Sequence, residues 1–431
     1  MFFNKTFSAE RKVLQVSHKM LNLIGVWDNE ARDNRRIYRY FALVGWMLLN
    51  IMIPKAVLGS GKDGFDSVAR NLAEFIFFSD VCIASGIFVT RRRSYGQLVQ
   101  VLKETFDRYE SKEYVQEIRK FNRRMDSFAR GYNAYVGLML ALFLGIPIIS
   151  TLCKWIFVSD YKRTDYILII EVQYYYLDIR RNIVHYLIYF ACAGPAIMCS
   201  AYQSGLKAAV FLTPLQYGAK LFDLIQMRIN NLRDVKAGEE RTDELRMIIE
   251  LHKMALKYTK LLEETLTFIL LNQILNCMAI WCLMMFYLST NFGPNASSVV
   301  VLFIVLMGEM VVFCFNGTRL SESALAVSHA IFKHPWHLEP VAMQRDLRFM
   351  MQRAQRPTGI TAANFYFVNI ERLGLVMQAS YSYYLILKTI KRTHTDMHGW
   401  GVMVIRYGSL EESEPVFPFS RNQVIVKLMH V

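Results

Sequence analysis

The chain of 431 residues has a hydrophobic content of 53%, a charged fraction of 20% and a net charge of +14. Soluble domains carry about 25% charged residues, so this composition favours a membrane protein. The basic residues lie mainly between long apolar runs, and no basic helix interleaved with aromatic residues indicates nucleic-acid binding. The seven cysteines lack the spacing of a zinc site or a disulfide framework, and the first 36 residues are too polar for a signal peptide.

Apolar runs long enough to cross a bilayer recur along the chain, since a spanning helix needs about 20 residues. The clear runs, in chain order, are Ile37–Leu58, Asn71–Thr90, Gly131–Cys153, Ile183–Leu212, Leu266–Thr290 and Ser297–Asn316. A further run, Ala363–Ile390, contains several polar residues and is therefore expected to face an aqueous path or other helices. The sequence thus predicts an all-α membrane protein with seven transmembrane helices.

The distribution of Lys and Arg predicts the orientation of these helices. Most basic residues outside the runs lie in segment 1–36 and in the connections between the second and third, fourth and fifth, and sixth and seventh runs. Basic loops stay in the cytoplasm, so the N-terminus is expected inside and the C-terminus outside, opposite to G-protein-coupled receptors. The sequon Asn295-Ala-Ser297 then lies in an outer loop, which makes Asn295 a candidate glycosylation site.

The predicted cytoplasmic connections carry apolar residues at helical spacing, as in Leu98, Val101 and Leu102 and again between Leu245 and Leu256. Such helices either pack together below the membrane or lie on its surface, and their narrow apolar stripes favour packing. The three acidic residues inside predicted spans, Glu74, Asp80 and Glu309, are either functional groups or paired ions.

Short motifs follow one another in the C-terminal third of the chain. They are Cys314-Phe-Asn-Gly-Thr-Arg-Leu at the end of the sixth run, Trp336 after a short helix, Gln355-Arg-Pro357 before the seventh run and Ser380-Tyr-Ser-Tyr-Tyr within it. This ordered set resembles the signature of insect odorant receptors. Tyr174-Tyr-Tyr-Leu-Asp178 is also similar to an outer-loop motif of that family, with Tyr in place of its Pro. The resemblance spans roughly residues 1–391.

The resemblance implies one subunit of a tetrameric, ligand-gated, non-selective cation channel. In that family a variable odorant-binding subunit assembles with a common co-receptor, and the short fourth-to-fifth connection here is similar to the odorant-binding type. The expected location is the plasma membrane of a sensory neuron dendrite. A gustatory-receptor-like channel and a seven-helix G-protein-coupled receptor are the alternatives. No enzyme, cofactor or metal pattern is present.

The expected domains follow from the spans and the resemblance together. They are a cytoplasmic N-terminal segment (1–36), helices one to six with cytoplasmic helical extensions (37–316), a cytoplasmic anchor segment (317–362), a pore-lining seventh helix (363–391) and an atypical extracellular tail (392–431).

Two groups of residues are candidates for function. A small, volatile, apolar or aromatic odorant needs an aromatic cavity with few polar groups. The candidates for that cavity are Phe75, Phe78, Tyr135, Met139, Phe143, Tyr186, Tyr189, Phe190, Phe303 and Met307. On the last helix Gln378, Ser382, Ile386 and Ile390 lie four apart on one face, and the resemblance places the gate at the two isoleucines. Aromatic packing in the core and lipid-facing isoleucines are the alternatives.

Overall fold

The computed structural model describes residues 19–21, 23, 38–58, 65–108, 112–157, 166–170, 172–291 and 296–410. Its longer helices are α3 (Tyr38–Met47), α4 (Phe65–Arg108), α5 (Lys112–Phe157), α6 (Ile183–Asn231), α7 (Glu239–Thr290), α8 (Ser297–Lys333), α9 (Val341–Ala354) and α10 (Ile370–Leu410). The short elements are η2 (Leu48–Met52), η3 (Pro54–Leu58), η5 (Leu232–Asp234), η7 (Trp336–Leu338), β1 (Thr361–Ala362) and β2 (Tyr366–Phe367). The predicted all-α class is confirmed.

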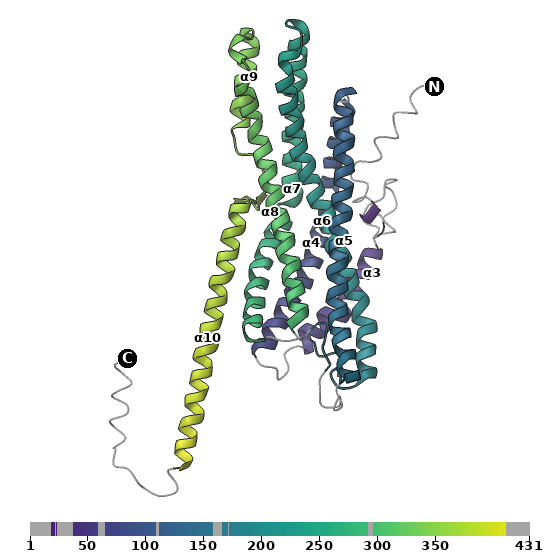
Figure 1. The fold of residues 1–431 in the computed structure, drawn as a ribbon, viewed down its shortest axis with the longest axis vertical. Coiled ribbons are helices and arrows are strands. Elements are labelled where there is room, and N and C mark those ends of the chain that lie inside the picture. The colour runs from purple at the N-terminus through teal and green to yellow at the C-terminus, as the bar shows by residue number, and fades with distance from the viewer. Residues whose placement is uncertain are drawn as a thin grey trace, which may run out of the picture. The chain divides into compact units, whose positions relative to one another are not determined.

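The long helices α4 to α8 lie side by side (Figure 1). Helix α4 packs chiefly on α7, α6 packs on α8, and α5 contacts both α6 and α8. Within the described residues, these five helices are long and apolar enough to cross a membrane. The first predicted span is helical as α3, η2 and η3, and the last forms part of α10. Which way the spans run through the bilayer stays a prediction.

The helices continue well beyond the predicted spans, and their extensions are packed rather than free. The apolar side chains of Leu98, Leu102, Leu221, Phe222 and Ile248 are all completely buried within the chain. Burial of these stripes against neighbouring helices removes the apolar surface that a helix lying on a bilayer would need. The expectation that the extensions pack together is therefore confirmed.

The seventh predicted helix begins later than expected. The structure forms a small antiparallel hairpin, β1–β2, over residues 361–367, and α10 begins only at Ile370. The turn residues Ala363 and Asn364 have φ angles of 48° and 62°, a left-handed conformation that stops a right-handed helix. The hairpin is tied to α7, since Ala363 N donates to Thr267 Oγ1 at 2.7 Å and Thr361 Oγ1 donates to Glu263 Oε1 at 2.5 Å.

The chain divides into two compact units, residues 1–381 and 382–431. In the first unit, the beginning of α10 buries Leu373, Val376 and Ser380. In the second unit the helix continues past Ile390 to Leu410, so the first part of the atypical tail is helical.

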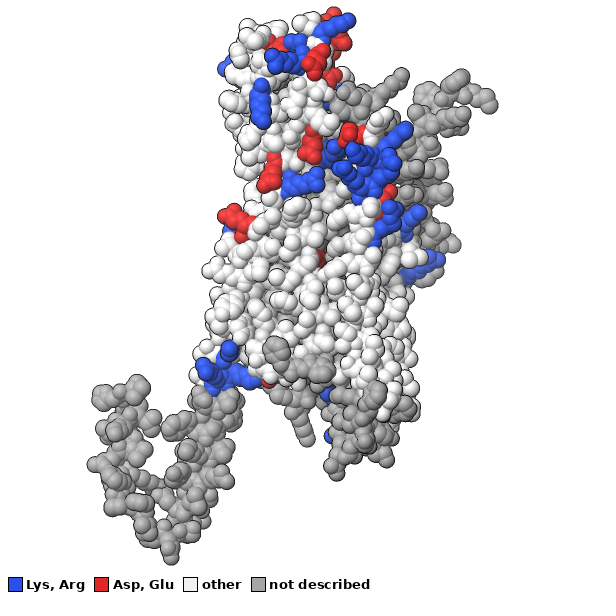
Figure 2. Space-filling model, viewed as in Figure 1, with Lys and Arg blue, Asp and Glu red and all other residues white. Residues whose placement is uncertain are grey.

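Charge is distributed unevenly over the face of the molecule shown in Figure 2. A broad middle band is almost free of charged residues, whereas Lys and Arg gather above it. Arg119, Lys120, Arg123 and Arg124 of α5 are neighbours in such a basic surface. An uncharged band bounded by basic residues is typical of a protein embedded in a bilayer.

Candidate functional site

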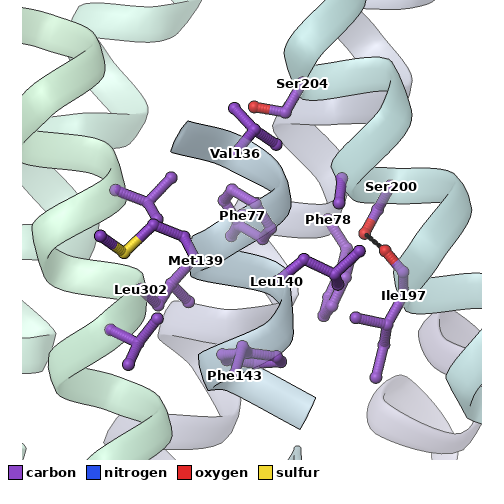
Figure 3. A pocket seen from close by; sticks show the side chains of 13 residues that line it. Phe77, Phe78, Val136, Met139, Leu140, Phe143, Ile197, Ser200, Ser204 and Leu302 are labelled. Atoms are coloured by element: carbon purple, nitrogen blue, oxygen red, sulfur yellow. Dashed lines mark hydrogen bonds between the residues drawn. The ribbon is translucent and has the colours of Figure 1, made fainter. Parts of the chain in front are cut away.

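An apolar cavity lies between α4, α5, α6 and α8 (Figure 3). Its lining residues are Phe77, Phe78, Val136, Met139, Leu140, Phe143, Ile197, Ser200, Ala201, Ser204, Val301, Leu302 and Val305. Three phenylalanine rings, one methionine and aliphatic side chains dominate this surface, and the two serines are its only polar side chains. A cavity with this apolar lining suits small, mainly hydrocarbon molecules.

The structure brings some of the predicted odorant residues together at this cavity and places the others elsewhere. Phe78, Met139 and Phe143 line it. Phe75, Phe190, Phe303 and Met307 are partly buried and packed against the hydrophobic core without lining it. Tyr135 directs its hydroxyl to the backbone of α8, donating to Ile304 O at 3.3 Å.

Tyr186 and Tyr189, also predicted for the odorant site, instead support a buried segment, residues 166–170. Tyr186 donates to Ile167 O at 3.3 Å, and the Tyr189 hydroxyl accepts from Ile170 N at 3.2 Å. The Tyr189 ring also packs edge-on against Tyr174 at 5.3 Å between centroids. Buried tyrosine hydroxyls need such partners, so these rings position the segment rather than face the cavity.

A buried ionic cluster lies one helical turn beyond the cavity. Lys207 Nζ lies 3.1 Å from Asp80 Oδ2 and 2.9 Å from Glu309 Oε1, and it donates to Gln273 Oε1. Asp80 Oδ1 accepts further hydrogen bonds from Asn272 and Asn276, at 2.5 and 2.8 Å. The cluster therefore joins α4, α6, α7 and α8, and two carboxylates share one ammonium group.

A second buried cluster holds the segment 166–170 against the helices. Glu74 lies 2.6 Å from Lys55 Nζ and 2.9 Å from Arg70 Nε. The Arg70 guanidinium also donates to Leu168 O at 3.4 Å and to Ser298 Oγ at 2.9 Å. The three acidic residues flagged in the spans, Glu74, Asp80 and Glu309, are thus all paired.

The proposed pore residues lie on α10. Gln378 belongs to the first unit and Ser382, Ile386 and Ile390 to the second, and all four side chains are exposed in the single chain. Ile386 is 54% and Ile390 51% exposed. Asn295, the candidate glycosylation site, lies outside the described residues.

Sequence reasoning missed several residues that the structure brings to the site. Phe77 lies next to Phe78 but was not selected, and Ser200 and Ser204 do not stand out because they are small. Lys207 carried a usable signal, since a lysine inside the apolar run Ile183–Leu212 needs a buried partner.

Comparisons with known proteins identify the family. The family model for the seven-transmembrane odorant receptors matches residues 66–381. Odorant receptor 10 of Aedes albopictus is 21% identical over 360 residues, which cover 82% of this chain and 92% of that protein. Odorant receptor 63a of Drosophila melanogaster is 23% identical over 203 residues, covering 45% of this chain and 48% of that receptor.

A solved structure has the same fold. The olfactory receptor OR5 of Machilis hrabei in complex with eugenol superposes with a TM-score of 0.74 at 14% sequence identity, covering 90% of this chain and all of that one. The family model matches well over half of the chain, and we conclude that this protein is a membrane protein of the insect odorant receptor family.

Proposed function

We propose that the cavity between α4, α5, α6 and α8 is the odorant site of a ligand-gated cation channel. The observation that carries this proposal is the lining itself, in which Phe77, Phe78 and Phe143 surround an apolar space between four helices. Phenylalanine rings favour a planar aromatic ligand through offset or edge-on stacking. The structural neighbour from Machilis hrabei was solved with eugenol, which supports a small ligand of this kind.

The channel part of the proposal concerns α10 and a partner subunit. Gln378, Ser382, Ile386 and Ile390 form one face of α10, polar at its start and aliphatic toward its end. A ring of aliphatic side chains around a pore closes the pore by excluding water. Ile386 and Ile390 are therefore the proposed gate. The exposure of this face in the single chain fits a helix that meets other subunits.

The proposed assembly is a heterotetramer with the common odorant co-receptor, in the plasma membrane of a sensory neuron dendrite and with a cytoplasmic N-terminus. The direct test is expression of the full chain with a co-receptor, followed by current recordings across a panel of volatile odorants. Odorant-evoked cation current in the paired cells, and none with the co-receptor alone, is the expected result. Receptor that reaches the surface with the co-receptor and yields no evoked current would contradict it.

Replacing Met139 by alanine is expected to raise the odorant concentration that gives half response by about tenfold, because it removes apolar contact from the cavity wall. Current recordings over a concentration series measure the shift. Met198→Ala is the matched control, since Met198 is on α6, is 54% exposed and does not line the cavity. Equal responses from both variants at equal surface expression would argue against this cavity as the odorant site.

Replacing Ile386 by alanine is expected to raise the current measured without odorant, because a smaller side chain weakens the water-excluding constriction. Leu385→Ala is the control on a neighbouring face of α10 and should leave the basal current unchanged. Basal currents that stay equal in wild type and Ile386→Ala, at matched surface expression, would remove Ile386 from the gate.

A further inference from the structure

The two serines in the cavity wall differ in how their hydroxyl groups are used. Ser200 Oγ donates to Ile197 O of its own helix at 2.8 Å. This is the usual arrangement for a buried helical serine, and Ser79 on α4 does the same toward Phe75 O at 2.8 Å. Ser204, one turn further along α6, has no hydrogen-bond partner among the described residues and is only 4% exposed.

The unpartnered hydroxyl of Ser204 points into the cavity. In Figure 3 it extends from α6 toward Val136 of α5, while the Ser200 hydroxyl is joined to Ile197 of the same helix. All the other side chains that line this cavity are apolar. A ligand that fills the cavity covers this hydroxyl, and a ligand atom that accepts its hydrogen bond avoids the cost of leaving it buried without a partner.

Among the described residues, no hydrogen bond joins the Ser204 hydroxyl to another protein group. Lys207 follows one turn beyond Ser204 on α6, but its ammonium group is directed to Asp80, Glu309 and Gln273. Asp80 is engaged with Lys207 and the asparagines of α7, and Glu309 pairs with Lys207 through Oε1. Ser204 remains the one side chain in the cavity wall with a hydrogen to donate.

We propose that Ser204 selects odorants that carry a single oxygen acceptor on an otherwise hydrocarbon body, and that it donates a hydrogen bond to that oxygen. The phenylalanine side of the cavity takes the hydrocarbon or aromatic part, and the Ser204 end takes the carbonyl, ether or hydroxyl oxygen. This inference rests on the proposed odorant site and adds the chemical class of its ligand. Discrimination by one hydrogen bond is modest, because the oxygen is also hydrated in water.

The test uses matched pairs of odorants that differ by one group, beginning with acetophenone and ethylbenzene, in which a carbonyl replaces a methylene. Half-response concentrations are measured for the full chain expressed with a co-receptor. Ser204→Ala is expected to weaken the response to the oxygenated member by about twofold to tenfold and to leave the hydrocarbon unchanged. Ser204→Thr, which keeps a hydroxyl, should retain the preference for the oxygenated member.

Ser200→Ala is the matched control, because that hydroxyl is already bonded within α6. It should not change the ratio between the two members of a pair. An equal shift for both members in Ser204→Ala, or hydrocarbons as potent as their oxygenated partners on the wild-type receptor, would overturn the selection by Ser204. If this cavity is not the odorant site at all, Met139→Ala would leave the half-response concentrations of both odorants in a pair unchanged. That outcome is distinct from a failure of the selection by Ser204.

Discussion

Replacing Lys207 by methionine is expected to remove most of the receptor from the cell surface, and the odorant-evoked current with it. The substitution leaves Asp80 and Glu309 facing each other without their shared ammonium group, in a site where all three side chains are less than 10% exposed. Removing one partner of a buried ion pair costs about 3–5 kcal/mol, a large part of the roughly 5–15 kcal/mol that stabilises a folded protein. Surface biotinylation and thermal unfolding of the detergent-solubilised receptor measure the loss.

A rescue variant separates loss of charge balance from loss of the lysine itself. Lys207→Met combined with Asp80→Asn and Glu309→Gln keeps the side-chain volumes and leaves no unpaired charge. Replacing a whole buried ion cluster by neutral groups is often close to neutral, so this variant should recover most of the surface receptor. Lys253→Met is the control for an exposed pair, since Lys253 contacts Glu250 with 66% of its side chain exposed. A stable Lys207→Met receptor, or a triple variant as unstable as the single one, would show that charge balance does not hold these helices together.

The spans were largely predictable because a bilayer imposes one simple requirement on a helix, a long apolar run. The runs Asn71–Thr90, Gly131–Cys153, Ile183–Leu212, Leu266–Thr290 and Ser297–Asn316 all fall within helices that meet this requirement. The helical extensions were predictable too, since their apolar residues recur with the period of a helix.

The cavity was less predictable because its wall depends on which face of each helix turns inward. Phe75 and Phe77 are two residues apart on α4, yet only Phe77 reaches the cavity. Tyr186 and Tyr189 are aromatic residues at helical spacing and therefore looked suitable. Their hydroxyls, however, form hydrogen bonds with the backbone of Ile167 and Ile170, in a segment that is not helical. Such long-range hydrogen bonds leave no pattern in a single sequence.

The predicted start of the last helix was wrong for a similar reason. Ala363 and Asn364 adopt left-handed backbone angles. Alanine rarely adopts this conformation, so its presence in a sequence does not predict a turn. The hairpin is held by partners on other helices, among them Thr267 of α7 and Thr318 of α8, whose Oγ1 accepts from Ile370 N at 3.0 Å. The boundary between hairpin and α10 is therefore set by tertiary contacts, and composition alone could not locate it.

Those contacts make Gly317 the second position where a small change should have a large effect. A Cβ atom at Gly317 on α8 would overlap the carbonyl oxygen of Val368, a backbone atom at the end of the hairpin. Val368 N itself donates to Ile360 O at 2.9 Å, so the backbone there has little freedom to move away. Gly317→Ala is therefore expected to push the segment before α10 away from α8, at a cost of about 1–3 kcal/mol or more.

The sign of this effect distinguishes close packing from helix propensity. Alanine is favoured over glycine inside a helix by up to about 1 kcal/mol, so a free position would become more stable on substitution. Gly374→Ala, on α10 with no atom within 4 Å of the new Cβ, should show that gain, whereas Gly317→Ala should lower the unfolding temperature and the evoked current per surface receptor. If α10 lines the pore as proposed, displacement of the hairpin also changes gating. The evoked current per surface receptor then falls by a larger factor than the number of receptors at the cell surface. Equal stability gains at both glycines would mean that α8 and the hairpin do not meet as closely as their backbones indicate.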